Sequence, residues 1–345
     1  MGHLTGVRTT AGRAGRREWL GVWIELLVLF VGGLVILGCG GECLVRGAAQ
    51  LARQLGVAPL VVGLTIVAFG TSAPEIAVSI RSAARGHDAL AVANAVGSCI
   101  MNVLVVLGLA ALVRPLRVSR NIQRIDAPFM VFFTAVFLLF AVDDGRIDRW
   151  QGLFFVGSIV LYTAFTYLES KRQPDIVAEE YEHDPRQKPR PWPVNLLAVI
   201  IGLVGLTQGA DLIVQGAVGL ARSLGVSPRI IGLTIVALGT SLPEMATCIV
   251  AARRNQPDIA IGNIVGSNIF NILAVIGLSA SIYPLKVPQS TINLDAPVML
   301  ATAVLMIPIM RTGRRVSRTE GLLLLACYGG YLAWMLRGIP YPSSA

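Results

Sequence analysis

Two glutamates stand alone within long apolar stretches, each at the end of a string that occurs twice. The first string reads GLTIVAFGTSAPE and ends at Glu75, and the second reads GLTIVALGTSLPE and ends at Glu244. A carboxylate within sequence that otherwise favours hydrocarbon is costly to bury, so such a residue indicates a functional site by default. The two glutamates are therefore candidate ligands for positive charge.

The helix that carries each glutamate is predicted to break just before it. Pro74 and Pro243 lack an N–H, which leaves the carbonyls four residues earlier, at Gly70 and Gly239, without their helical partners. At membrane depth, such backbone is tolerated only where it is buried in protein or lines a water-filled cavity. Hydroxyl groups add further oxygens at the two breaks, on Thr71, Ser72, Thr240 and Ser241.

A second duplicated string supplies amides and hydroxyls. It reads NAVGSCIMN from residue 94 and NIVGSNIFN from residue 263. In each copy Asn, Ser and Asn are spaced by four, so each trio projects from one face of a helix. The trios are Asn94, Ser98 and Asn102 in the first copy, and Asn263, Ser267 and Asn271 in the second.

Together these groups indicate a site for a hard cation. Carboxylate, carbonyl, hydroxyl and amide oxygens suit Ca²⁺, which takes about six to eight of them, whereas Mg²⁺ dehydrates reluctantly and fits less naturally. Two negative charges match one Ca²⁺ or two Na⁺. A single break or a single Asn–Ser face would also suit a structural kink or close helix packing. The duplication of both strings, each copy with its own glutamate, favours the ion site.

The remaining residues exclude several other chemistries. None of the five cysteines is matched between the copies, and the three histidines fall in the tail and the loops. We therefore predict no zinc site, no catalytic triad, no enzyme activity and no cofactor. The net charge of +9 comes from basic residues between the apolar segments. Because no recognition motif accompanies them, they indicate contact with membrane lipid rather than with nucleic acid.

Composition predicts an all-α polytopic membrane protein, because 54% of the residues are hydrophobic and only 14% are charged. Between Gly40 and Met299 the two copies match at a constant shift of 169 positions, the separation of Glu75 and Glu244. Five helices per copy, an odd number, would place the copies in the membrane in opposite directions, as inverted repeats. With about 20 apolar residues per crossing, we predict ten transmembrane helices at roughly 24–50, 58–84, 88–113, 125–142, 149–169, 193–222, 229–253, 257–282, 294–310 and 319–337.

The predicted organisation has five parts. They are an N-terminal tail over 1–23, a first five-helix repeat over 24–170, a cytoplasmic linker over 171–193, a second five-helix repeat over 194–337 and a C-terminal tail over 338–345. Lys and Arg between the helices place the linker in the cytoplasm and both termini outside a cell inner membrane, although four arginines of the N-terminal tail oppose this orientation.

Two further acidic pairs match across the copies. Glu42 and Asp211 are each followed, four positions on, by a basic or an amide residue. This spacing favours a structural or gating role over ion ligation. Asp126 and Asp295 each open a predicted helix after a loop, and helix N-capping accounts for them without an ion.

At the duplicated strings the chain resembles the sodium/calcium exchanger family, within the calcium:cation antiporters. The strings G-T-S-x-P-E and N-x-x-G-S-N-x-x-N look like the two α-repeats of that family, although the first copy has Cys99 where the second has Asn268. The resemblance covers nearly the whole chain. It implies an antiporter that exchanges Ca²⁺ for Na⁺ by alternating access, with broken helices at the ion site and a monomer sufficient for transport.

The resemblance also implies a ligand for each ion. Glu75 and Glu244 would bind Ca²⁺ and share in Na⁺ binding, with Asn102 and Asn271 beside them. The same family pattern assigns carbonyls of Thr71 and Thr240, hydroxyls of Ser72, Ser241, Ser98 and Ser267, and carbonyls of Ala68 and Ala237 for flanking sodium sites.

Three alternatives stay open. A Ca²⁺/H⁺ antiporter is one, because two buried glutamates could take protons in place of sodium. A K⁺-dependent Na⁺/Ca²⁺ exchanger is disfavoured, because asparagine at both Asn102 and Asn271 leaves only two central carboxylates. A cation channel or ion sensor built on the same ligands is the different class, and a channel requires a continuous pore with weak, multiple binding sites.

Overall fold

The computed structural model describes residues 8–172, 191–226 and 237–337, which form helices joined by short loops and two pairs of very short strands. Several helices contain a π-helical turn, labelled η. The elements of the first half are α1 (Arg8–Leu55), α2 (Pro59–Val62), η1 (Gly63–Val67), α3 (Ala68–Thr71), α4 (Ala73–Ala84), α5 (Asp88–Met101), η2 (Asn102–Val106), α6 (Leu107–Val113), β1 (Leu116–Arg117), η3 (Ile122–Asp126), α7 (Ala127–Asp144), β2 (Arg146–Ile147) and α8 (Arg149–Lys171).

The second half repeats this order. Its described elements are α10 (Trp192–Ser223), α12 (Ala237–Thr240), α13 (Leu242–Arg253), α14 (Pro257–Phe270), η5 (Asn271–Ile276), α15 (Gly277–Ile282), β3 (Leu285–Lys286), η6 (Thr291–Asp295), α16 (Ala296–Arg311), the 3₁₀ turn η7 (Thr312–Arg314), β4 (Arg315–Val316) and α17 (Arg318–Arg337).

The chain is an all-helical, multi-pass membrane protein. Among the described residues, seven helices are long and apolar enough to cross a membrane, and the bent pair Pro59–Thr71 and Ala73–Ala84 makes an eighth span. The predicted crossing at 229–253 lies partly outside the described residues. The crossing predicted at 319–337 coincides with the 20 residues of α17, which is not among those eight. The count of ten stays a prediction.

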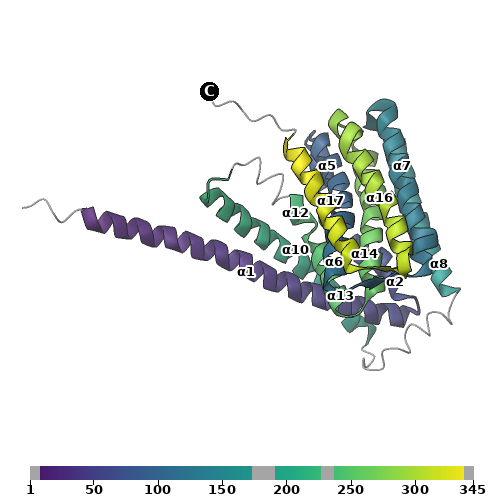
Figure 1. Cartoon of the computed structure of the whole chain (residues 1–345), viewed down its shortest axis with the longest axis horizontal. Coiled ribbons are helices and arrows are strands. Elements are labelled where there is room, and N and C mark those ends of the chain that lie inside the picture. The colour runs from purple at the N-terminus through teal and green to yellow at the C-terminus, as the bar shows by residue number, and fades with distance from the viewer. Residues whose placement is uncertain (1–7, 173–190, 227–236, 338–345) are drawn as a thin grey trace, which may run out of the picture.

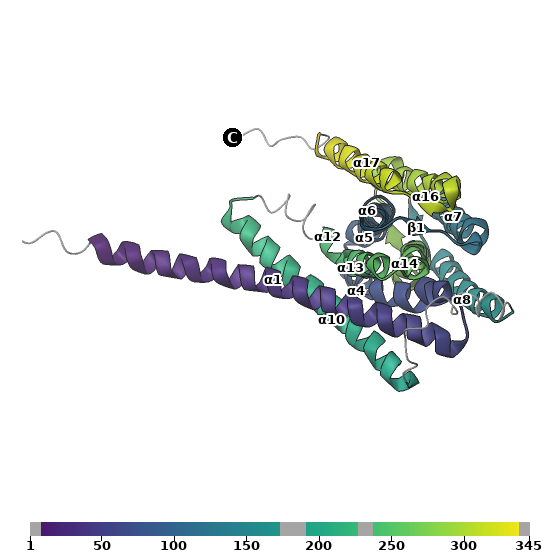
Figure 2. The same cartoon turned by 60° about the horizontal axis from the view of Figure 1, so that its bottom comes forward.

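Two long helices stand apart from the others. α1 and α10 pack along each other and are steeply inclined to an upright bundle formed by the remaining helices (Figure 1). The turned view shows the same pair crossing one face of the bundle, next to α13 (Figure 2). The molecule therefore consists of a two-helix unit lying across a larger helical bundle.

Glycine lets the backbones of α1 and α10 touch. A β-carbon on Gly40 would lie 2.7 Å from the backbone nitrogen of Leu206, and one on Gly209 would lie 2.6 Å from that of Leu37. A side chain larger than hydrogen cannot fit at such separations. Gly38, on the same helix, has no atom within 4 Å of the equivalent point. Small residues thus lie where the two backbones meet, as is usual for close helix pairs in membranes.

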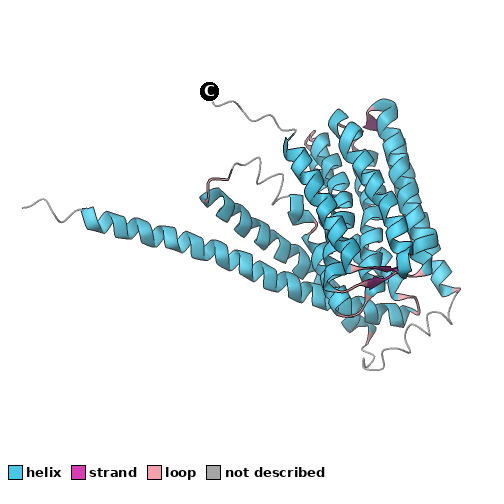
Figure 3. Ribbon diagram, in the orientation of Figure 1, coloured by secondary structure: helices cyan, strands magenta, loops and turns pink. Residues whose placement is uncertain are grey.

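The two strand pairs tie together loops from both halves. β1 pairs with β4, and β2 pairs with β3, both antiparallel. They lie at opposite ends of the upright bundle (Figure 3). Each half therefore contributes one loop to each end of the molecule.

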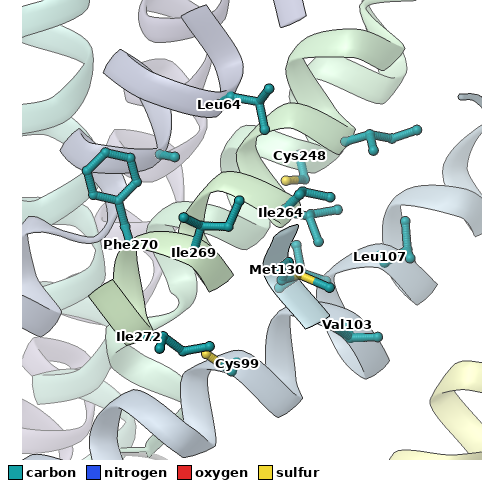
Figure 4. Packing of buried hydrophobic residues seen from close by; sticks show 14 of the residues in the cluster. Leu64, Cys99, Val103, Leu107, Met130, Cys248, Ile264, Ile269, Phe270 and Ile272 are labelled. Atoms are coloured by element: carbon teal, nitrogen blue, oxygen red, sulfur yellow. The ribbon is translucent and has the colours of Figure 1, made fainter. Parts of the chain in front are cut away.

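α14 runs through the centre of the bundle. All of the most apolar part of the span Pro257–Ile282 is buried. Its glycines allow close contact with the first half, since a β-carbon on Gly266 would lie 2.7 Å from the carbonyl oxygen of Leu64. Figure 4 shows part of the surrounding core, in which Leu64, Met130 and Ile264 come from three different helices. This packing brings the two duplicated strings together.

Three predictions on the ends and the linker compare as follows. α1 begins at Arg8, so part of the segment predicted as a tail is helical. Alanine, arginine and leucine in this stretch favour helix, and no proline interrupts it. Most of the predicted linker over 171–193 and the predicted tail over 338–345 lie outside the described residues.

The N-cap interpretation of the two aspartates is wrong. Asp126 and Asp295 end the π-helical turns η3 and η6, so each lies inside a continuous helix and neither makes a side-chain cap. Instead, Asp126 Oδ1 accepts a hydrogen bond of 2.8 Å from the Tyr162 hydroxyl, and Asp295 Oδ1 one of 2.9 Å from Tyr331. The tyrosines are separated by the same 169 positions as the aspartates, so the sequence did contain this signal.

Candidate functional site

Both helices that carry a site glutamate are broken where the sequence predicted. α3 ends at Thr71 and α4 begins at Ala73, with a bend of 43° between the spans on either side. Ser72 has φ −83° and ψ 1°, outside the helical range, and Ser241 takes φ −91° and ψ 4° at the second break. Each glutamate follows three residues later, in the first turn of the helix beyond the break.

The two glutamates lie buried in the interior of the bundle. Glu75 is fully buried and Glu244 is 1% exposed. Ser72 Oγ donates to Glu244 Oε1 at 3.3 Å. Three of the four carboxylate oxygens lack a hydrogen-bond partner within the described part of the chain. They are both oxygens of Glu75 and Oε2 of Glu244.

Hydroxyl groups connect the two halves around these carboxylates. Thr71 Oγ1 donates to Asn263 Oδ1 at 3.0 Å and lies 3.4 Å from Ser267 Oγ. Ser241 Oγ donates to Ser98 Oγ at 3.4 Å. Each of these contacts joins a helix break in one half to an Asn–Ser helix in the other half. The site is therefore built jointly by the two copies.

The second asparagine of each trio lies at a π-helical turn. η2 begins at Asn102 and η5 begins at Asn271, and both residues are completely buried. Such turns are rare and occur often at functional sites. Among the described residues, Oδ1 of Asn102 and both amide atoms of Asn271 lack hydrogen-bond partners. The two amides therefore present unused polar atoms inside the protein.

The described contacts place most of the predicted ligands in one region. Glu75, Glu244, Asn102 and Asn271 are buried, and so are Thr71, Ser72, Ser98, Ser241 and Ser267. The carbonyl of Ala68 accepts hydrogen bonds from the Ser72 N–H at 3.0 Å and from Thr71 Oγ1 at 3.3 Å. Thr240 is only half-buried. Ala237 begins α12, and its side chain lies outside what the structure describes.

Asn268 was not predicted to hold the site together. Its Oδ1 accepts from Asn102 Nδ2 at 3.5 Å, and its Nδ2 donates to Met130 Sδ at 3.5 Å. Asn268 thus lies between Asn102 and the core, a position that Cys99 cannot reproduce in the first copy. The signal was the one mismatch, cysteine against asparagine, within otherwise matched polar positions.

The first asparagine of each trio supports the glutamate helix. Asn94 Nδ2 donates to the carbonyl oxygen of Glu75 at 3.2 Å and to Ser79 Oγ at 3.0 Å. In the second half, Asn263 Nδ2 donates to Cys248 Sγ at 3.3 Å. Ser79 and Cys248 occupy matching positions, so both copies use the same contact with a different acceptor. These asparagines fix the orientation of the helices that carry the carboxylates.

The charge and donor set fit a hard cation. Two carboxylates are buried, and no ion pair found among the described residues involves either of them. No group of three or more His, Cys, Asp or Glu side chains gathers in the part of the chain that the structure describes. Buried carboxylates need a cation, protons or strong hydrogen bonds nearby. Carboxylate, hydroxyl and amide oxygens together can surround Ca²⁺ or Na⁺.

Comparison with known proteins identifies relatives over both halves. The family model described as "Sodium/calcium exchanger protein" matches residues 25–168 and 194–337. The chain is 36% identical over 313 residues to the inner membrane protein YrbG of Escherichia coli, which covers 89% of this chain and 94% of YrbG. It is 30% identical over 344 residues to the sodium/calcium exchanger MaX1 of Methanosarcina acetivorans, which covers 90% of this chain and 98% of MaX1.

A solved structure shares the fold. The sodium-calcium exchanger NCX_Mj soaked with zero Na⁺ and Ca²⁺ superimposes with a TM-score of 0.78 at 30% identity, covering 90% of this chain and 99% of that chain. The superposition extends across nearly the whole of both proteins. The similarity therefore includes the arrangement of the helices as well as the duplicated strings.

Proposed function

Because this chain belongs to the sodium/calcium exchanger family, we propose that it exchanges Ca²⁺ for Na⁺ across the membrane by alternating access. The family consists of transporters, so the protein is an antiporter rather than an enzyme. Its ions are substrates, and the activity needs no cofactor. The observation that carries the choice of ions is the pair of buried glutamates, three of whose four oxygens lack a partner among the described residues.

The ligands of the proposed site come from both halves. Glu75 and Glu244 supply the two negative charges that balance Ca²⁺, and Asn102 and Asn271 supply amide oxygens beside them. Na⁺ uses subsets of the same oxygens, so the two ions exclude each other and exchange follows. The further proposed ligands are the carbonyls of Thr71, Thr240, Ala68 and Ala237 and the hydroxyls of Ser72, Ser98, Ser241 and Ser267.

The proposed architecture is ten transmembrane helices in two inverted repeats of five. The repeated order of elements and the strand pairs at opposite ends of the bundle support it. Two strands can pair only if they lie on the same side of the membrane, so the chain must cross the membrane an even number of times between them. Ten helices meet this condition for both β1 with β4 and β2 with β3. In this orientation the linker lies in the cytoplasm, both termini lie outside, and a monomer in a bacterial-type inner membrane carries out transport.

Isotope flux in proteoliposomes tests this proposal. Purified protein is reconstituted in Na⁺-loaded vesicles, and uptake of ⁴⁵Ca²⁺ is measured after dilution into Na⁺-free medium. We expect uptake that depends on the outward Na⁺ gradient and that stops when the gradient is dissipated. Empty vesicles and vesicles loaded with K⁺ or choline serve as controls. Uptake that ignores the Na⁺ gradient would reject Na⁺ coupling.

The same assay separates the two related alternatives. A Ca²⁺/H⁺ antiporter would take up Ca²⁺ with an outward H⁺ gradient alone, since the two carboxylates can carry protons in place of Na⁺. A K⁺-dependent exchanger would need K⁺ on the Ca²⁺ side. Only two central carboxylates flank the asparagines Asn102 and Asn271, and this charge favours the K⁺-independent reaction.

A further inference from the structure

An ion pair outside the site joins α1 to α13. Glu42 on α1 pairs with Arg254, the residue that follows α13, and with Arg46 on its own helix, at 2.6 Å between Arg46 Nε and Glu42 Oε1. The helices also pack at this point, since a β-carbon on Gly41 would lie 3.3 Å from Val250 Cγ2. Because Glu244 lies on α13, this pair connects α1 to a helix that carries a site carboxylate.

The sequence contains both partners of this pair a second time. The shift of 169 positions takes Glu42 to Asp211 on α10, and it takes Arg254 back to Arg85, the residue that follows α4. α4 carries Glu75, so the second pair would join α10 to the other glutamate helix. Asp211 and Arg85 are both exposed. Within the residues that the structure describes, they form no ion pair.

The residues around the first pair are also more buried than the residues around the second. Ala246 and Val250 on α13 are half-buried beside α1, whereas the matching residues on α4, Ala77 and Arg81, are exposed.

Ala77 and Arg81 therefore lack the cover that α1 gives to Ala246 and Val250. Thus α1 is closed onto α13 at one end of the molecule, and the equivalent interface of α10 with α4 is open at the other end.

We propose that the pairs Glu42–Arg254 and Asp211–Arg85 form alternately and hold the two end states of the transport cycle. The glycine contacts make α1 and α10 one unit, so a movement that closes α10 onto α4 also withdraws α1 from α13. The inference rests on the proposed function in one respect, that the carrier opens to either side in turn. Partly exposed ion pairs are weak, so each pair biases a state without trapping it.

Distance measurements by pulsed electron paramagnetic resonance test the alternation. Spin labels on cysteines at Gln215 and His87, both exposed, report the separation of α10 from the end of α4. Cys39, Cys43 and Cys327 are replaced by alanine, and the buried Cys99 and Cys248 remain. The full chain is measured in lipid nanodiscs without Ca²⁺, and the readout is the ratio of short to long distances.

Opposite changes are expected from the two neutralisations. Glu42→Gln should raise the ratio of short to long distances and Asp211→Asn should lower it, each about two- to fivefold, as expected for partly exposed ion pairs. The charge swap Asp211→Arg with Arg85→Asp should restore the ratio, because the residue one turn after position 211, Gln215 in the native chain and the labelled cysteine here, carries no charge. Glu25→Gln, which neutralises an exposed carboxylate on α1, is the matched control and should change nothing.

The alternation is rejected if both neutralisations behave like the Glu25 control, if they shift the ratio in the same direction, or if the swap restores nothing. The measurement involves no ion flux, so its result is independent of which cation is transported. If the ratios shift as expected but the protein shows no Na⁺-driven Ca²⁺ flux, the alternating ion pairs are supported and the proposed exchange of Ca²⁺ for Na⁺ is rejected.

Discussion

Glu75 and Glu244 end matching sequence strings but have different neighbours. Glu244 accepts a hydrogen bond from Ser72, whereas both oxygens of Glu75 lack a partner in the described part of the protein. An unpaired buried carboxylate is strongly unfavourable, so Glu75 depends most on a bound cation or on a proton. The duplicated site is therefore not symmetric at the level of single residues.

Neutralising either glutamate should abolish exchange without unfolding the protein. Glu75→Gln or Glu244→Gln removes one of two charges that balance Ca²⁺. Removing one partner from a buried pair of opposite charges costs about 3–5 kcal/mol. Here the pair is one carboxylate and the bound Ca²⁺, so we expect the rate of ⁴⁵Ca²⁺ uptake at subsaturating Ca²⁺ to fall about a hundredfold or more. Asp143→Asn, on an exposed position of α7, is the control and should keep its rate. Na⁺-driven uptake by both glutamine variants would show that these residues are not ligands of the transported ions.

Asn268 should affect Ca²⁺ binding through Asn102. Asn268→Ala leaves Nδ2 of Asn102 without its acceptor, and an unsatisfied buried amide costs about 1–3 kcal/mol. The Asn102 amide can then turn away from the site, so we expect the apparent Ca²⁺ affinity to fall about fivefold or more while maximal uptake changes less. Asn121→Ala, at an exposed position, is the control. An unchanged affinity in Asn268→Ala would show that Asn102 needs no such support.

At the scale of elements, the close fit of α1 against α10 should be sensitive to a single methyl group. Gly40→Ala places a β-carbon 2.7 Å from backbone of α10. Such overpacking costs about 1–3 kcal/mol, so the melting temperature in detergent and the transport rate should both fall. Gly38→Ala is the matched control, because that point is open and alanine favours helix by about 1 kcal/mol. Equal melting temperatures for the two variants would contradict the fit.

The tyrosine–aspartate bonds should stabilise the packing of α8 on η3 and of α17 on η6. Tyr162→Phe removes the only described donor to the buried Asp126 Oδ1, at a cost of about 1–3 kcal/mol. We expect a melting temperature several degrees lower, with the Na⁺ dependence of uptake unchanged. Tyr167→Phe, on an exposed position of the same helix, is the control. If Tyr162→Phe melts like that control, the bond contributes nothing measurable.

Whether a feature could be predicted from the sequence depends on how far apart in the sequence the residues that form it lie. The breaks before Glu75 and Glu244 are local consequences of proline, and the Asn–Ser faces follow from helical periodicity, so the sequence was sufficient for both. Local pattern also suggested N-caps at Asp126 and Asp295, yet their partners lie 36 residues away on another helix. The contact of Asn268 with Asn102 likewise depends on how two helices pack, which periodicity cannot supply.

At the scale of the whole molecule, the duplication produces two units with different roles. The helices other than α1 and α10 make an upright bundle that contains both glutamates, and α1 with α10 lies across it as a separate pair (Figure 1). The site is assembled from the two copies, while each copy also gives one helix to the inclined pair. α10 packs against both helix breaks, at Gly70 beside Leu203 and at Gly239 beside Val214, so under the proposed alternating access a movement of the pair would act directly at the site.

The final prediction concerns membrane voltage, which acts on the charge of the whole loaded carrier. Two glutamates neutralise one Ca²⁺, so the Ca²⁺-loaded site is close to electroneutral. If more than two Na⁺ replace one Ca²⁺, the Na⁺-loaded carrier crosses with excess positive charge. Moving one charge through 100 mV changes the free energy by about 2.3 kcal/mol, roughly a fiftyfold bias at equilibrium.

Proteoliposomes clamped with K⁺ and valinomycin measure this bias. An inside-negative potential should drive Na⁺ inward and Ca²⁺ outward, and reversing the potential should reverse the preference. Vesicles with equal K⁺ on both sides, and therefore no potential, are the control. A flux ratio that does not follow the clamped voltage would mean electroneutral exchange, with two Na⁺ or two H⁺ per Ca²⁺. The charge of the two buried carboxylates would then be balanced equally in both loaded states.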